Sequence, residues 1–182
     1  MSGDLASVVA LASRVRLMAF DVDGVLTDGR LFLSDDGVEM KAFNSLDGHG
    51  LKLLQQAQIE VAIITGRRAR CVERRASELG IVHLFQGVGN KLEVMTALLA
   101  ERGVTVDAAG YMGDDLPDLP VMTACAFSAT PADGHAVVQR HASLVTARGG
   151  GRGAVREVCD FILEAQGRLP VLDAPYLRRD HR

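Results

Sequence analysis

Short apolar runs alternate with longer amphipathic stretches along most of this chain. The short runs predict strands, which we place at 17–20, 60–64, 83–85, 109–112, 125–128 and 143–145. Apolar residues at helical spacing predict helices at 48–57, 68–79, 91–102, 116–123 and 154–166. Alternation of strands and helices is typical of βαβ units. We therefore expect an α/β fold with a mostly parallel sheet flanked by helices.

A β-hairpin is predicted where this alternation is interrupted, at 30–43, just after the first strand. Segments 30–33 and 38–43 flank Asp36-Gly37, and Asp-Gly between two extended segments favours a hairpin turn. The hairpin, one helix and one strand use up the stretch between Asp28 and Thr65. We therefore expect no separate cap domain over the ends of the strands.

The length of 182 residues fits a single domain over 1–182, which buries about 70% of the surface of the unfolded chain. Glycines at 149–151 and 153 predict a flexible joint before the last helix. Segment 167–182 contains Pro170 and Pro175, and we expect an irregular C-terminal extension there.

Composition and charge exclude several classes of protein. The net charge of −3 argues against a nucleic-acid partner, because binding to phosphate backbones needs a concentrated basic surface. No apolar stretch approaches the ~20 residues that cross a membrane, and the N-terminal apolar stretch lacks the basic start of a signal peptide. Cys71, Cys125 and Cys159 are scattered and odd in number, as expected of a cytoplasmic protein with free thiols.

Carboxylates follow two of the predicted strands. Asp21 and Asp23 come directly after the first strand, and Asp114, Asp115 and Asp118 follow the strand that ends at Met112. Ligands of α/β sheets bind beyond the carboxyl ends of the strands. Adjacent carboxylates repel one another unless a cation lies between them, although Asp is also favoured where a helix begins.

Thr65 and Lys91 are further candidates at the same edge of the sheet. Thr65 ends an apolar strand, where it serves equally well as a catalytic hydroxyl or as a helix N-cap. Lys91 begins a helix, a position that is unfavourable for a cation unless an anion lies nearby.

Together these residues predict phosphoryl transfer. Asp21 would attack phosphorus and form an aspartyl-phosphate, and Asp23 would protonate the leaving alkoxide and then deprotonate water. Lys91 and Thr65 would neutralise charge in the transition state. Oxygen ligands from Asp21, Asp114 and a carbonyl near Asp23 would suit Mg²⁺.

The motifs in this order resemble those of the haloacid dehalogenase superfamily of phosphatases. They are DxDGVxTDG at 21–29, Thr65-Gly66-Arg67, Lys91 and GDDxxD at 113–118. Two further segments, 43–50 and the glycine-rich stretch before 154–158, resemble those of 3-deoxy-D-manno-octulosonate 8-phosphate phosphatases. With them, the resemblance to these phosphatases covers nearly the whole chain. This resemblance implies a Rossmann-like core, Mg²⁺-dependent hydrolysis of a sugar-acid phosphate in lipopolysaccharide precursor synthesis, and a homotetramer.

The resemblance also implies roles for individual residues. Asp21, Asp23 (through its carbonyl) and Asp114 would bind the metal, while Asp115 and Asp118 would support them. Arg67 lies two residues after Thr65, and its guanidinium can bind a substrate carboxylate with two hydrogen bonds. The implied substrate contacts are Asp23, Asn44, Ser45, Leu46, Asp47, Gly48, Arg67, Arg75 and Lys91. The hairpin and the C-terminal segment of one subunit would complete the site of a neighbour.

Three alternatives remain open from the sequence. A phosphatase for a nonulosonate 9-phosphate would use the same core. A receiver-like phospho-signalling domain also combines aspartates, Thr, Lys and Mg²⁺, but it would place an adjacent acidic pair first, whereas Asp114-Asp115 comes last here. An inactive subunit that only assembles through its hairpin is disfavoured, because none of the motifs is missing.

Overall fold

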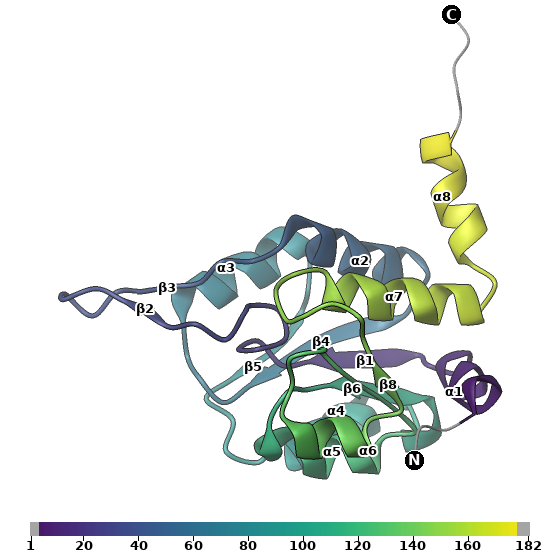
Figure 1. Cartoon of the computed structure of the whole chain (residues 1–182), viewed down its shortest axis with the longest axis horizontal. Coiled ribbons are helices and arrows are strands. Elements are labelled where there is room, and N and C mark those ends of the chain that lie inside the picture. Colours follow the sequence, from purple (N-terminus) through teal and green to yellow (C-terminus); the bar gives the residue numbers. More distant parts are fainter. Residues whose placement is uncertain (1–3, 178–182) are drawn as a thin grey trace, which may run out of the picture.

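A parallel sheet of six strands runs through the centre of the protein (Figure 1). The computed structural model describes residues 4–177. The strand order is β5-β4-β1-β6-β7-β8, and all paired neighbours are parallel. The strands are β1 (Leu17–Phe20), β4 (Glu60–Thr65), β5 (His83–Gln86), β6 (Ala109–Met112), β7 (Phe127–Thr130) and β8 (Leu144–Val145). The predicted α/β fold is confirmed, and β1 lies between β4 and β6.

Helices cover both faces of the sheet (Figure 1). One face carries α2 (Ser45–Gln56), α3 (Arg70–Leu79) and α7 (Ala154–Ala165), with α1 (Leu5–Ala12) packed against α7. The other face carries α4 (Lys91–Arg102), α5 (Leu119–Ala124) and α6 (Ala136–His141). Alternate residues of β1 enter two separate apolar clusters, Met18 and Phe20 on the first face and Leu17 and Ala19 on the second. Burial on both faces explains why β1 is apolar throughout.

Several element boundaries differ from the predicted ones. The predicted helix 116–123 is divided into a 3₁₀ turn, η2 (Leu116–Asp118), and α5. Strand β7 begins at Phe127, two residues later than predicted, because Cys125 N–H still bonds to Val121 and ends α5. Helices α1 and α6 and the short 3₁₀ helix η1 (Val106–Ala108) were not predicted from the sequence.

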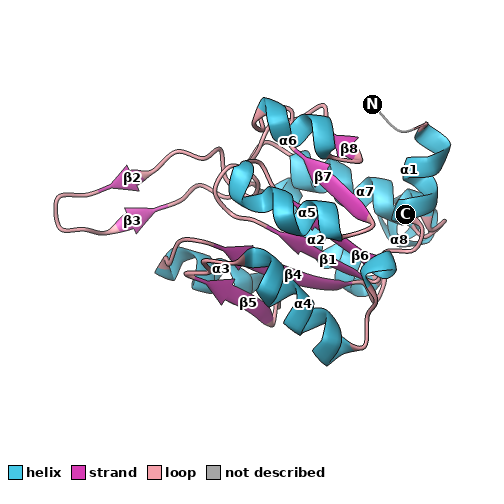
Figure 2. Cartoon of the chain, turned by 90° about the horizontal axis from the view of Figure 1, so that it is seen from below, coloured by secondary structure: helices cyan, strands magenta, loops and turns pink. Residues whose placement is uncertain are grey.

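The hairpin lies where it was predicted. Strands β2 (Phe32–Leu33) and β3 (Glu39–Met40) pair antiparallel, and Gly37 adopts φ +79° in the turn between them. Figure 2 shows this hairpin projecting from the body of the molecule. Within residues 4–177 no cap domain is inserted into the chain.

The expectation of a flexible joint at 149–153 is wrong. Gly151 N–H donates to the carbonyl of Val25 at 2.9 Å, and Gly150 N–H donates to Asp133 Oδ1 at 2.8 Å. A Cβ at Gly150 would lie 1.8 Å from the carbonyl oxygen of Gly24. These glycines therefore allow close packing against the loop after β1.

The expectation of an irregular extension is also wrong for residues 169–177. They form α8 (Leu169–Leu177), drawn in yellow in Figure 1, with Pro170 in the first turn, where its missing N–H costs no hydrogen bond. Residues 178–182 of the predicted extension lie outside the described part. Among the described helices, none is long and apolar enough to cross a membrane.

Candidate active site

The loop after β1 brings Asp21 to the edge of the sheet. Asp21 N–H donates to the carbonyl of Met112 at 3.0 Å, which extends the pairing of β1 with β6 by one residue. The carbonyl of Val22 then accepts hydrogen bonds from Val25, Leu26 and Thr27, so the chain turns sharply. Gly24 adopts φ +88°, and a Cβ there would lie 2.0 Å from Asp114 Oδ2. Only glycine lets this loop approach the second acidic motif so closely.

Asp118 organises the loop after β6. Its Oδ2 accepts hydrogen bonds from the backbone N–H groups of Asp114 at 3.1 Å and Asp115 at 3.3 Å. Its Oδ1 accepts one from Lys91 Nζ at 2.6 Å and one from the Tyr111 hydroxyl at 3.1 Å. Both oxygens are thus already used within the protein. The Asp115 side chain caps η2 through Leu116 N–H at 2.8 Å.

Lys91 is a buried cation beside Asp21. Its Nζ lies 3.0 Å from Asp21 Oδ1 and 2.6 Å from Asp118 Oδ1. Burial alone would lower the pKa of Lys91, but the two carboxylates outweigh it and raise the pKa, so the ammonium stays charged. These carboxylates are the anions that the position of Lys91 at the start of a helix required.

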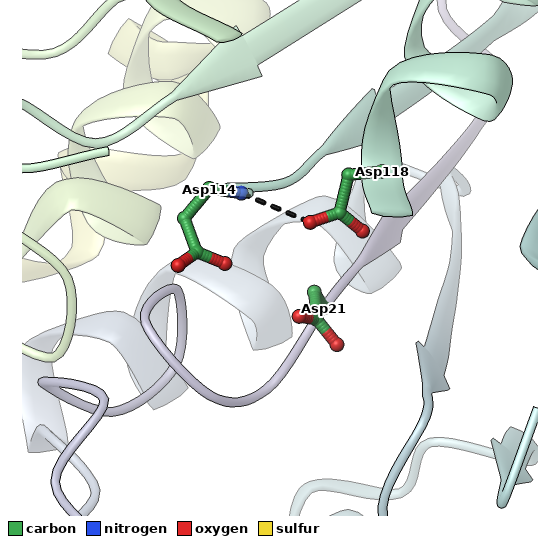
Figure 3. A group of neighbouring side chains, drawn as sticks. All are labelled: Asp21, Asp114 and Asp118. Atoms are coloured by element: carbon green, nitrogen blue, oxygen red, sulfur yellow. Dashed lines mark hydrogen bonds between the residues drawn. The ribbon is translucent and has the colours of Figure 1, made fainter. Parts of the chain in front are cut away.

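Three aspartates lie close together at this edge of the sheet (Figure 3), and when ionised they carry more negative charge than the single cation of Lys91 can neutralise. Asp21, Asp114 and Asp118 each offer a carboxylate oxygen within 4.8 Å of the others. Burial, followed by repulsion from Asp118, raises the pKa of Asp21 to about 6. Burial, followed by repulsion from Asp21 and Asp118, raises the pKa of Asp114 to about 8. A hard divalent cation fits this set, with Asp21 and Asp114 as its carboxylate ligands, since both oxygens of Asp118 already accept hydrogen bonds.

Asp23 belongs to a second charged group, which was not predicted from the sequence. Lys41 Nζ binds Asp23 Oδ1 and lies 2.6 Å from Glu39 Oε1. Arg67 Nη2 donates to Glu39 Oε2 at 2.9 Å, and Arg67 Nε lies 3.8 Å from Asp23 Oδ2. These four side chains form a closed ring of alternating charge, which we call the charge ring. Glu39 and Lys41 are two residues apart in the sequence, so both side chains can lie on the same side of the strand. This spacing is only a weak signal for the charge ring, because it does not show that the hairpin folds back onto Asp23.

One open cavity connects these groups. It has a volume of about 480 Å³, within the range of small-molecule sites. Thr65 lies in its wall and does not cap α3, whose N-cap is Ala69, so the alternative capping role is not realised. The lining residues, which define the aspartate cavity, are Asp21, Asp23, Gly29, Thr65, Gly66, Arg67, Val88, Gly89, Lys91, Asp114, Asp115, Pro117 and Asp118.

Other predicted substrate contacts lie outside the aspartate cavity of their own chain. Asn44 caps α2 through Leu46 N–H at 2.8 Å, and Ser45 and Leu46 are exposed. Asp47 accepts hydrogen bonds from Gly153 N–H at 3.3 Å and Arg156 N–H at 2.9 Å, so its carboxylate caps α7. Asn44 and Asp47 therefore stabilise the starts of α2 and α7.

Arg75 also lies apart from the aspartate cavity. Its guanidinium lies 5.9 Å from the ring centroid of Phe43, and its Nη2 donates to the Asn44 carbonyl at 3.4 Å. A Cβ at Gly48 would lie 2.2 Å from Arg75 Nη2, so Gly48 makes room for this side chain. Arg75 therefore supports the segment that joins the hairpin to α2.

Comparison with known proteins gives close relatives over most of the chain, although no family model matches it. The 3-deoxy-D-manno-octulosonate 8-phosphate phosphatase KdsC of Escherichia coli strain K12 is 49% identical over 164 residues, 90% of this chain and 87% of that protein. The corresponding phosphatase of Moraxella catarrhalis, solved with magnesium, phosphate and KDO, is 39% identical with a TM-score of 0.93, covering 95% of this chain and 99% of that one.

A third relative carries the superfamily name. The structure of a HAD superfamily hydrolase (subfamily III A) from Legionella pneumophila is 39% identical with a TM-score of 0.91, covering 96% of both chains. Identity near one half over nine tenths of the chain is far more than the short acidic motifs alone supply. This chain belongs to the 3-deoxy-D-manno-octulosonate 8-phosphate phosphatase family of the haloacid dehalogenase superfamily.

Proposed function

We propose that this protein is a Mg²⁺-dependent phosphatase that hydrolyses 3-deoxy-D-manno-octulosonate 8-phosphate to the free sugar acid and phosphate, a step in lipopolysaccharide precursor biosynthesis. The observation that carries the proposal is the buried Asp21 carboxylate between Lys91 and Asp114 at the carboxyl end of β1, in a chain 49% identical to such a phosphatase. An aspartate placed there can act as a nucleophile toward phosphorus.

Asp21 is the proposed nucleophile. An oxygen of its carboxylate forms a bond to phosphorus while the bond from phosphorus to the sugar oxygen breaks. Lys91, held by Asp21 and Asp118, neutralises charge on the phosphoryl oxygens, and the Thr65 hydroxyl donates to them. When bound through Asp21, Asp114 and the Asp23 carbonyl, Mg²⁺ supplies further neutralisation of this charge.

Asp23 is the proposed general acid and base. Its carboxyl group gives a proton to the departing sugar oxygen, and the resulting carboxylate then takes a proton from the water that attacks the aspartyl-phosphate. The bond from phosphorus to Asp21 breaks, which regenerates the Asp21 carboxylate and releases inorganic phosphate, so one water is consumed for each ester hydrolysed. Arg67, half exposed at the mouth of the cavity, is the proposed partner of the substrate carboxylate.

The remaining predicted substrate contacts, Asn44, Ser45, Leu46, Asp47, Gly48 and Arg75, are kept as a prediction for the assembled protein. The proposed assembly is a homotetramer. Its support is the row of apolar side chains exposed on the hairpin, because such a surface favours burial against another chain. These side chains are Leu31, Phe32, Leu33, Val38 and Met40. A cytoplasmic location is also proposed, in keeping with three free cysteines.

The substrate assignment is tested by steady-state hydrolysis of a panel of sugar-acid phosphates. We expect kcat/KM for 3-deoxy-D-manno-octulosonate 8-phosphate to exceed that for a nonulosonate 9-phosphate by at least about 10-fold, the effect of one misplaced polar contact. Phosphate release is the measurement. Equal rates on all members of the panel would contradict the specific substrate, and a preference for the 9-phosphate would favour the alternative.

The assembly is tested by placing charge on the hairpin. Phe32→Asp with Leu33→Asp puts two carboxylates on an exposed apolar surface and is expected to convert the tetramer to smaller species in light scattering. A tetramer that persists with both carboxylates in place would contradict the role of the hairpin.

Deletion of 173–182 tests whether the C-terminal segment completes a neighbouring site. A fall in kcat/KM is the expected result.

A further inference from the structure

The charge ring links the hairpin to the aspartate cavity of the same chain. Lys41 follows β3, and its side chain is 1% exposed although the hairpin itself projects into solvent (Figure 2). The only carboxylates paired with Lys41 among the described residues are Asp23 and Glu39. Burying a lysine costs free energy unless it is paired, so this contact gives the hairpin a fixed position over Asp23.

The two carboxylate oxygens of Asp23 have different surroundings. Oδ1 is bound by Lys41 Nζ. Oδ2 is buried and accepts no hydrogen bond from the described residues, and the nearest cation paired with it is Arg67, whose Nε lies 3.8 Å away. The ring thus anchors one oxygen and leaves the other without a hydrogen bond.

Glu39 ties the two cations of the ring together. Its Oε1 lies 2.6 Å from Lys41 Nζ, and its Oε2 accepts from Arg67 Nη2 at 2.9 Å. Arg67 is 45% exposed, so it can exchange Glu39 for a ligand, whereas the buried Lys41 has no such freedom. Lys41 is therefore the fixed member of the ring and Arg67 the exchangeable one.

We propose that Lys41 is a positioning residue for the phosphatase reaction: by binding Asp23 Oδ1 it holds this carboxyl group at the wall of the aspartate cavity, in the orientation from which it exchanges protons with the leaving group and water. The proposal rests on the proposed function, in which Asp23 is the general acid and base. Proton transfer needs the carboxyl group within hydrogen-bond reach of the reacting oxygen. The hairpin then has a role in catalysis within its own chain, in addition to any role in assembly.

A positioning role and a purely structural role differ in their dependence on the leaving group. A poor leaving group such as an alkoxide needs a proton from Asp23 as its bond to phosphorus breaks, whereas p-nitrophenolate leaves readily without one. General acid catalysis contributes roughly 10²–10⁴-fold where it is needed. Loss of Lys41 should therefore affect poor leaving groups selectively, while a distorted site would slow all substrates alike.

The test uses Lys41→Met in the full chain and a series of phosphate monoesters without a carboxylate, from p-nitrophenyl phosphate through phenyl phosphate to an alkyl phosphate. Their lack of a carboxylate removes any effect on substrate binding by Arg67. The quantity measured is kcat/KM with Mg²⁺, which reports phosphoryl transfer to Asp21 and not the later hydrolysis. We expect a loss of about 10²-fold for the alkyl ester, within the range of general acid catalysis, and less than about 3-fold for the p-nitrophenyl ester.

Two further variants make the result decisive. Arg102→Met removes a cation at the end of α4, outside the hairpin and the aspartate cavity, where Arg102 is 42% exposed and 2.7 Å from Glu60, and should change neither ester by more than about 2-fold. Asp23→Asn should reproduce the leaving-group dependence of Lys41→Met. If Lys41→Met does not fold, Lys41→Gln, which keeps a polar end, repeats the measurement.

The outcomes separate this inference from the proposed function. If Asp23→Asn slows all esters equally, the acid role of Asp23 fails, and the inference fails with it. If Asp23→Asn is selective but Lys41→Met slows all esters equally or none, the proposed function stands and the positioning role of Lys41 is overturned. Selective loss in both variants, with Arg102→Met unaffected, supports both.

Discussion

Asp21→Asn is expected to lower kcat by roughly 10⁶-fold, the scale seen when a catalytic nucleophile is removed. An amide has nearly the volume of a carboxylate but does not attack phosphorus. The fold should persist in the metal-free protein, because the substitution removes one of three crowded negative charges that face Lys91. Phosphate release measures the loss of activity, and thermal unfolding with EDTA measures the fold.

A control and a trapping experiment complete this prediction. Asp107→Asn changes an exposed aspartate in η1, before the amino end of β6, and should leave kcat unchanged. Rapid-quench mass spectrometry of the wild-type protein should find the phosphoryl adduct on Asp21. An adduct on another residue, or activity of Asp21→Asn within 10-fold of the wild-type value, would refute covalent catalysis by Asp21.

The part of the site that the sequence predicted is the part set by strand ends. Asp21, Thr65 and Asp114 each follow an apolar run, and parallel strands bring their carboxyl ends to one edge, so the order of apolar runs was enough to bring them together. Lys91 was identified because a cation at a helix start requires anions, and these are Asp21 and Asp118.

The charge ring could not be predicted in the same way. The Asp-Gly turn indicates a hairpin but says nothing about the path that brings Lys41 back to Asp23, 18 residues earlier. The role of Asp47 could not be predicted either, because its carboxylate caps α7 through Gly153, which is 106 residues away in the sequence. The glycines at 149–151 were wrongly expected to form a flexible joint. The sequence does not distinguish a glycine required by close packing, such as Gly150 against Gly24, from a glycine in a flexible linker.

Removal of the metal is expected to abolish activity and to change how stability depends on pH. EDTA should lower kcat by at least about 10³-fold, because a bound cation supplies several kcal/mol of charge stabilisation, and Mg²⁺ should restore it. In the metal-free protein the pKa of Asp114 is raised from 3.8 to about 8 and that of Asp21 to about 6. Both shifts come first from burial and then from neighbouring carboxylates.

These raised pKa values set the sign of the pH dependence. Between pH 3.8 and about 8 the folded metal-free protein binds more protons than the unfolded chain, so its free energy of unfolding falls as pH rises. The stabilisation is complete below pH 3.8 and is lost as pH rises through about 6 and about 8. Mg²⁺ binds the deprotonated carboxylates and neutralises their repulsion. The melting temperature with Mg²⁺ should therefore exceed that with EDTA by more at pH 8 than at pH 5.5.

Asp114→Asn is the matched variant for this prediction. It removes the carboxylate with the larger shift, so most of the pH dependence of the metal-free melting temperature should disappear, together with much of the stabilisation by Mg²⁺. Asp107→Asn should retain both. A difference between the two melting temperatures that stays constant from pH 5.5 to 8 in the wild-type protein would contradict the view that repulsion among Asp21, Asp114 and Asp118 creates the metal site.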